Sequence, residues 1–199
     1  METTKQIATL RVVGGNLALD FVNTVDGEPA FDHLRDYAGL VAWGGHVGLL
    51  SEESVLRLIR KPPVPDAEAA HGRALALRDD LRGIFGAIAL GENPPESSLE
   101  ALRKGECEAL DQATLAPKGD GYGWGWPDGE VGSVLWPVVH AAVELLTSGP
   151  LHRVKTCAGC HWLFVDESKN RSRRWCTMEV CGTNEKMRRY IARRAARRG

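Results

Sequence analysis

The stretch KTCAGCHWLFVDESKNRSRRWCTMEVCG, Lys155–Gly182, holds four of the five cysteines in a chain of 199 residues. These cysteines follow the pattern C-x2-C-x15-C-x4-C and are Cys157, Cys160, Cys176 and Cys181. Two cysteines separated by two residues can bring both sulfurs of one turn to the same ion, and zinc takes four soft ligands in a tetrahedron. The spacing therefore predicts one structural zinc ion per chain, with no open position for a catalytic water.

Two other interpretations of these cysteines remain open from the sequence. A redox C-x-x-C pair normally opens a helix after a strand and acts alone, so the second pair argues against it. Buried and inert cysteines are the other alternative. His152 and His161 could compete as ligands, although four cysteines already complete a site. Cys107, between two glutamates on an expected helix, is predicted to be an ordinary thiol.

The charge of the chain is unevenly distributed. Residues 151–199 contain thirteen lysines and arginines against four acidic residues, a net charge of +9, whereas the remaining residues, with twelve against twenty-two, carry −10. The change falls at Thr147-Ser148-Gly149-Pro150, a sequence that stops helices. We therefore predict an acidic domain over residues 1–149, able to fold alone, and a basic module over residues 150–199.

The first 149 residues show mainly helical patterns. Apolar residues recur every three or four positions over 66–90, which predicts an amphipathic helix. Gly119-Asp120-Gly121 lies between an apolar and an aromatic segment, which predicts a β-hairpin over 112–126. The expected class is α+β, a mainly helical domain with a small antiparallel sheet, followed by a four-cysteine zinc-finger module that ends in a basic helix. Other expected elements are a strand at 7–13 and helices near 17–22, 51–60, 96–110 and from Trp136 onward.

The C-terminal segment after Cys181 has no helix breaker before Gly199 and is rich in alanine and arginine, which predicts a helix. Met187, Ile191 and Ala195 would share one face, expected to dock on the protein, and a cationic face would remain in water. Such a face suits a polyanion, with base contacts expected from the Arg171–Arg174 segment. The alternatives are a solvated tail, or docking to protein, RNA or the acidic domain. The candidate nucleic-acid contacts are Lys169, Arg171, Arg173, Arg174, Lys186, Arg188, Arg189, Arg193 and Arg197.

The residues around the cysteines also carry a family resemblance. The pattern C-x2-C-x-W-x-F-x-D-x-S-x-N-x-S-R-R-W-C-x-M-x-x-C-G resembles the CGNR zinc finger, and NLALDFVNT with the later DYAGLVAW resembles the ABATE domain of bacterial stress-induced transcription regulators. The resemblance implies a zinc-dependent DNA-binding module, with the four cysteines as ligands, attached to a regulatory or ligand-sensing domain. Thr183-Asn184 stands where the family has Asn-Arg, so the family's arginine is missing.

The N-terminal domain offers weaker candidates. Polar residues near one helical stretch, together with a tryptophan, could line a pocket for a small molecule, although caps and turns are the favoured explanation. No phosphate loop, metalloprotease motif or nucleophile elbow is present in the sequence, so we expect no enzyme, and an enzyme with the finger as an accessory is the least favoured alternative. The absence of a long apolar run or a signal peptide favours a cytoplasmic protein without a membrane partner. The candidate ligand-binding residues are Asn16, Asp20, Asn23, Thr24 and Trp43.

Overall fold

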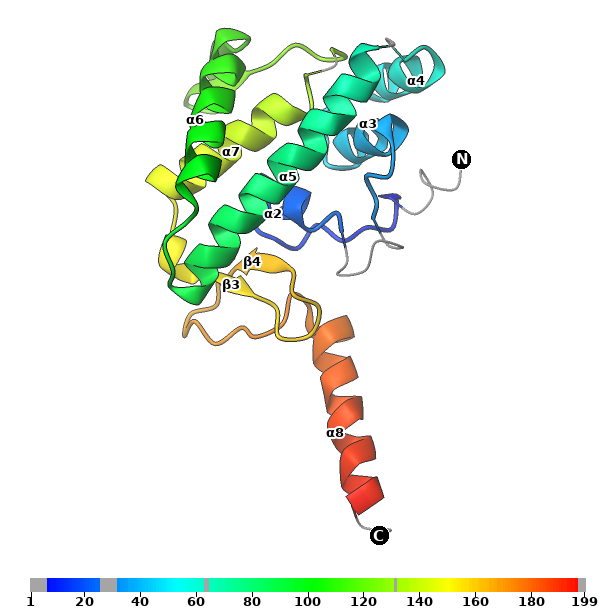
Figure 1. The fold of residues 1–199 in the computed structure, drawn as a ribbon, viewed down its shortest axis with the longest axis vertical. Coiled ribbons are helices and arrows are strands. Elements are labelled where there is room, and N and C mark those ends of the chain that lie inside the picture. The colour runs from blue at the N-terminus through cyan, green and yellow to red at the C-terminus, as the bar shows by residue number, and fades with distance from the viewer. Residues whose placement is uncertain (1–6, 26–31, 63–64, 131, 197–199) are drawn as a thin grey trace.

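The computed structural model describes residues 7–25, 32–62, 65–130 and 132–196 and is mainly helical, with two small antiparallel sheets (Figure 1). The predicted α+β class is confirmed. The elements of the first domain are α2 (Leu17–Val22), α3 (Tyr37–His46), α4 (Glu52–Arg60), α5 (Asp66–Leu90), α6 (Glu96–Asp111), β1 (Thr114–Lys118), β2 (Gly121–Gly125) and α7 (Leu135–Thr147). The C-terminal elements are the 3-10 turn η2 (Leu151–Arg153), β3 (Val154–Thr156), β4 (Leu163–Val165), the π-helical turn η3 (Met178–Gly182) and α8 (Thr183–Ala196).

Local signals in the sequence determine most of these boundaries. Asn16, Asp36 and Ser51 are N-caps whose side chains accept hydrogen bonds from backbone N–H groups of the first turns of α2, α3 and α4. Helix α5 ends where Gly91 adopts a left-handed conformation, φ 76°, as helix C-termini often do. In the β1–β2 hairpin the two-residue turn begins at Gly119, which also has positive φ.

The long helix α5 lies at the centre of the first domain (Figure 1). Helices α2, α3 and α6 pack against it, and α7 packs on α2 and α6. The core between them contains the largest fully buried side chains, among them Trp43 and Phe21, whose rings meet edge to face at 5.1 Å. The aliphatic face of α5 contributes Leu81 and Ile84 to the same core.

The hairpin β3–β4 of the C-terminal segment joins this core. It packs on α5 and α2, and Val154, Leu163, Phe164 and Val165 belong to the same cluster of buried residues as the helices of the first domain. The two parts that the charge pattern separates at Gly149-Pro150 thus meet through a continuous apolar contact.

Two local expectations are wrong. Residues 10–13 form an irregular segment instead of a strand, because the backbone N–H groups of Val13 and Gly14 bond the carboxylate of Asp20. Helix α8 has no buried residue and extends away from the rest of the molecule (Figure 1), so its apolar face is not docked. The exposed side-chain fractions there are 54% for Met187 and 61% for Ile191.

Candidate metal centre and nucleic-acid interface

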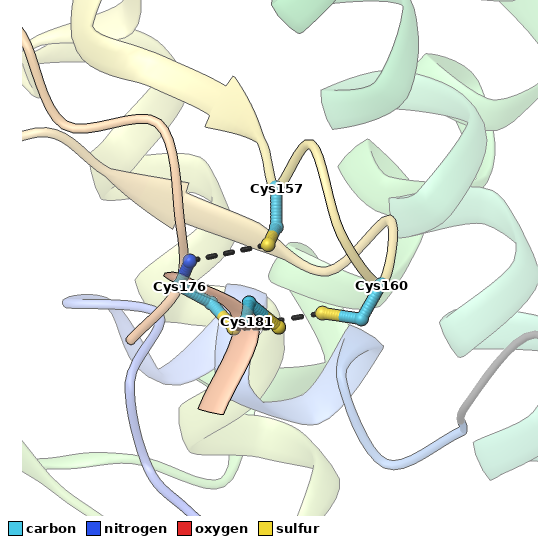
Figure 2. Close-up of side chains that lie close together, drawn as sticks. All are labelled: Cys157, Cys160, Cys176 and Cys181. Carbon is cyan, nitrogen blue, oxygen red and sulfur yellow. Dashed lines mark hydrogen bonds between the residues drawn. The ribbon is translucent and has the colours of Figure 1, made fainter. Parts of the chain in front are cut away.

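The four predicted ligand cysteines converge on one point (Figure 2). Cys157 follows β3, Cys160 lies in the turn after it, Cys176 ends the long connection from β4, and Cys181 lies in η3. Their sulfur atoms all lie within 4.8 Å of one another. The Sγ atom of Cys176 is 3.5 Å from that of Cys160 and 3.6 Å from that of Cys181.

This geometry fits a tetrahedral metal ion. A zinc ion with Zn–S bonds of about 2.3 Å requires sulfurs separated by about 3.8 Å, which is close to the observed spacing. Two backbone N–H groups also point at the Cys157 sulfur, from Gly159 at 3.4 Å and from Cys176 at 3.2 Å. Hydrogen bonds of this kind orient the ligands of a metal site.

Hydrogen bonds between the thiols shift their pKa values. A hydrogen bond between the Cys160 and Cys176 sulfurs favours a thiolate at Cys176, so it lowers the pKa of Cys176 and raises that of Cys160. Burial raises the pKa of the Cys181 thiol. Metal binding requires deprotonated thiols, so ligation and proton release would occur together at this cluster.

Two glycines lie close to side chains at the cluster. A Cβ atom added at Gly159 would lie 3.1 Å from the Cβ atom and 3.4 Å from the Sγ atom of Cys181. A Cβ atom at Gly182 would lie 2.9 Å from the side chain of Met178. Gly159 therefore allows the backbone to approach Cys181 closely, whereas a side chain at Gly182 would meet the flexible end of Met178.

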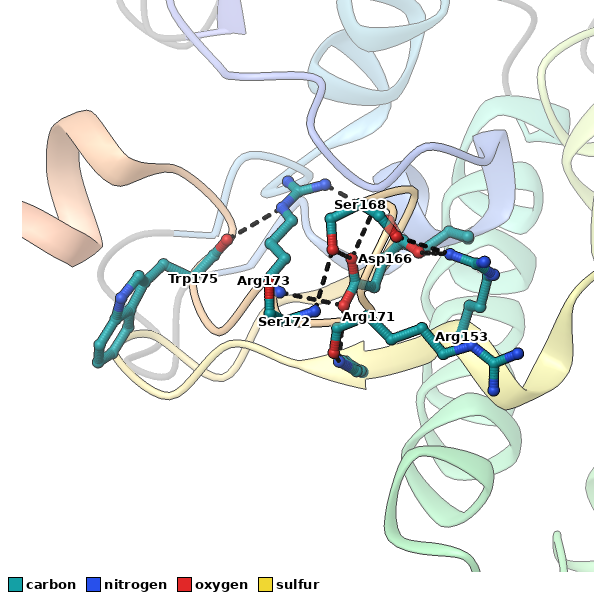
Figure 3. A network of polar contacts seen from close by, with 9 residues as sticks. Arg153, Asp166, Ser168, Arg171, Ser172, Arg173 and Trp175 are labelled. Carbon is teal, nitrogen blue, oxygen red and sulfur yellow. Dashed lines mark hydrogen bonds and ion pairs between the residues drawn. The ribbon is translucent and has the colours of Figure 1, made fainter.

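The connection between β4 and Cys176 is organised by one buried carboxylate, Asp166 (Figure 3). It accepts hydrogen bonds from the Ser168 hydroxyl at 2.6 Å, from the Arg173 backbone N–H at 3.1 Å and from the Lys155 ammonium at 2.6 Å. Burial alone would raise the pKa of Asp166, but the bonds from Lys155 and Ser168 outweigh it and hold that pKa well below its usual range. The aspartate and serine of the motif thus shape this loop.

Arg173 also has an internal role. Its guanidinium donates to the carbonyl oxygens of Trp175, Cys176 and Val13, and it lies over the Phe164 ring with a distance of 4.3 Å to the centroid. These contacts join the metal cluster to the N-terminal segment. Arg173 was a predicted nucleic-acid contact, but its hydrogen bonds are used within the protein.

The other predicted basic contacts fall into two groups. Lys169, Arg171 and Arg174 are exposed on the loop before Cys176. The second group lies on α8 and is also exposed, with Arg189 paired to Glu185 at 2.7 Å; it consists of Lys186, Arg188, Arg189 and Arg193. Arg197 lies outside the described residues. At the family's Asn-Arg position, the Thr183 hydroxyl donates to the Met178 carbonyl and Asn184 is exposed.

Asn23, a candidate for ligand binding, instead connects the two parts of the chain. Its buried side chain donates to the Leu163 carbonyl at 2.8 Å and accepts from the Leu163 N–H at 2.9 Å. Two residues further along β4, the Val165 N–H donates to the Gly14 carbonyl at 2.8 Å. The segment from Gly14 to Asn23 therefore covers the outer edge of β4.

The remaining candidates each have structural contacts. Asn16 caps α2, and Asp20 holds the preceding backbone. The Thr24 hydroxyl donates to the Phe21 carbonyl and accepts from Arg78, while Trp43 is buried in the core. Caps, turns and core packing therefore account for the positions of these side chains.

Sequence reasoning missed three residues near the metal cluster. Arg11 donates to the Thr177 hydroxyl at 3.2 Å, Arg153 donates to the Asp166 and Ser168 carbonyls, and Lys155 pairs with the Asp166 carboxylate. Lys155 and Asp166 lie eleven residues apart, on and just after adjacent strands. A hairpin register deduced from the cysteine spacing would have revealed that pair, whereas nothing local indicates the contact of Arg11.

These observations define a class of protein: a helical domain joined through a common core to a small four-cysteine module that ends in an exposed basic helix. Residues 153–194 match the CGNR zinc finger. Residues 15–149, more than half of the chain, match ABATE, described as "Putative stress-induced transcription regulator", so the chain belongs to the ABATE family. The resemblance seen in the sequence is thereby confirmed. No curated protein matches the chain, and none of the helices within the described ranges has the length and apolarity to cross a membrane.

Proposed function

We propose that this protein is a zinc-dependent, stress-responsive transcription regulator that binds DNA through its C-terminal module, with the N-terminal domain as the sensor. The observation that carries the proposal is α8, which leaves the cysteine cluster, has no buried residue and contains five basic residues against one acidic residue. The match to a family of transcription regulators agrees with this assignment. We assign no catalytic reaction to the chain.

The metal in this proposal is one zinc ion held by the four cysteines. Four thiolates complete the coordination shell, so the ion supplies folding energy to the module and has no role in catalysis. With zinc and four thiolates bound, residues 151–199 gain a net charge of −2, which changes their charge from +9 to +7. The module remains strongly cationic.

The geometry of α8 suits duplex DNA. Its fourteen residues form a rod about 21 Å long, and the major groove of B-DNA, about 12 Å wide, admits an α-helix. Lys186, Arg189 and Arg193 follow one side of the rod, where they can reach successive phosphates. Lys169, Arg171 and Arg174, exposed on the loop before Cys176, add positive charge to the module.

The test is the salt dependence of binding to a labelled duplex, followed by fluorescence anisotropy between about 50 and 200 mM salt. Contacts to about four phosphates give a slope near −3.6 in a plot of log affinity against log salt concentration. The double variant Arg189→Glu, Arg193→Glu should bind all sequences more weakly and with a flatter slope. The control is Arg60→Glu, Arg73→Glu, which makes the same charge change at exposed positions on α4 and α5.

A second candidate function rests on the exposed apolar face of α8. Met187, Tyr190 and Ile191 are all more than half exposed, which also suits docking to a protein, and the basic residues would suit RNA. If the α8 double variant binds DNA as tightly as the control does, DNA binding through α8 is refuted. The interaction-protein alternative would then be preferred, with RNA and acidic proteins as the ligands to examine.

A further inference from the structure

A groove of about 660 Å³ lies in the N-terminal domain, far in sequence from the cysteines. The β1–β2 hairpin forms one wall, and residues of α7 and the first residue of α2 contribute to the rest. This volume falls within the usual range of small-molecule sites, about 300–1,000 Å³. The groove shares no residue with the polar pocket suggested by the sequence. The lining residues that give the groove its chemical character are Lys118, Tyr122, Trp124, Trp126, His140 and Glu144.

Three aromatic rings line the groove. They alternate with glycine in the segment GYGWGW, residues 121–126. Tyr122 is 71% exposed and Trp124 is 41% exposed. Trp126 is held in place, because its indole N–H donates to the Ala109 carbonyl at 2.8 Å and its ring lies 5.4 Å from that of His140. Aromatic side chains exposed to this extent on a short hairpin contribute little to the core and are available to a ligand.

Two carboxylates and one lysine lie at or next to the groove. Glu144 is exposed and lies 3.8 Å from His140 Nε2, and on the other side of the same ring His140 Nδ1 contacts Glu106 at 2.7 Å. The side chains of His140 and Glu106 are only 17% and 14% exposed, so Glu106 is a largely buried carboxylate behind the groove. Lys118 is the one lysine or arginine among the described lining residues, and its side chain is long and exposed.

We propose that this groove binds a small organic cation of the quaternary ammonium class. The negative faces of aromatic rings attract such cations, most strongly in the case of tryptophan, and the nearby carboxylates add to the attraction. A neutral aromatic molecule would gain only the apolar contact, and an anion would lack the attraction of the ring faces and the carboxylates. This inference concerns the N-terminal domain and does not depend on DNA binding by the C-terminal module.

The test uses benzyltrimethylammonium as the probe, with benzyl alcohol and benzoate as its neutral and anionic counterparts. Saturation-transfer NMR titrations on the full-length protein should give saturable binding of the cation, at least about fivefold tighter than that of either counterpart. Binding of benzyl alcohol or benzoate as tightly as the cation would overturn the proposal, and so would the absence of saturable binding of the cation.

Variants locate the site. Trp124→Ala and Tyr122→Ala should each weaken binding of the cation at least about threefold. Glu144→Gln should weaken binding of the cation and leave binding of benzyl alcohol unchanged. Tyr190→Ala and Glu96→Gln, at exposed positions on α8 and α6, are the matched controls and should bind as the unmodified protein does. Unchanged affinity in all three groove variants would show that the cation binds elsewhere and would refute the assignment.

Discussion

Replacing Asn23 by alanine tests the contact between the two parts of the chain. The Asn23 side chain is buried and satisfies both the N–H and the carbonyl of Leu163. Alanine would leave these two backbone groups buried without partners, and each such group costs about 1–3 kcal/mol. We therefore expect the free energy of unfolding to fall by about 2–6 kcal/mol, much more than the change of about 0.5 kcal/mol typical of surface substitutions.

The assay is urea denaturation of the zinc-loaded protein, followed by circular dichroism. Asn93→Ala, at an exposed position between α5 and α6, provides the control for loss of an asparagine side chain. Zinc release to a chelator should also be faster in Asn23→Ala, because β4 leads directly from the Cys160 turn. If Asn23→Ala and Asn93→Ala have the same unfolding free energy, the contact with Leu163 does not stabilise the protein and our reasoning is refuted.

The cysteine cluster, the buried carboxylate and the common core each lead to a further prediction. The purified protein should contain about one zinc per chain by elemental analysis, and Cys176→Ser should lose it; full zinc occupancy in this variant would exclude the proposed ligand set. Because the Asp166 pKa is lowered by folding, its carboxylate stabilises the protein above its unfolded pKa, about 3.9, and loses that effect as the pH falls further. The stability difference between the unmodified protein and Asp166→Asn should therefore be constant from about pH 8 to pH 5, and a difference that closes by about pH 6 would contradict this. A fragment of residues 1–149 should melt at a lower temperature than the full chain, because β3 and β4 no longer cover α2 and α5; equal melting temperatures in calorimetry would show that the C-terminal module does not stabilise this domain.

Local patterns in the sequence were enough to predict much of the fold. The period of apolar residues over 66–90 identified α5, and the turn at Gly119-Asp120 identified the β1–β2 hairpin. The cysteine spacing predicted that four side chains share one site, and the structure places their sulfur atoms close together. Each of these signals lies within a short stretch of chain, where secondary structure and turn geometry alone determine which residues meet.

Contacts between distant segments could not be predicted in this way. Residues 7–13 have the composition of a strand, but Asp20 supplies the hydrogen bonds that a partner strand would have supplied. The apolar face of α8 follows helical spacing, yet the spacing does not say whether a surface lies opposite it. Asn23 has the sequence features of a capping or ligand-binding residue, and only the fold shows that its partner is Leu163, 140 positions away.

The covered edge of β4 limits how far the zinc finger can be transferred to other proteins. An isolated segment of residues 150–199 would keep its four cysteines, but the Leu163 and Val165 backbone groups that now bond Asn23 and Gly14 would be open. An open strand edge pairs readily with other chains, so such a segment would tend to associate with copies of itself. A chimera that carries this finger into another protein must therefore also bring residues 14–23, or supply another segment that covers the same edge.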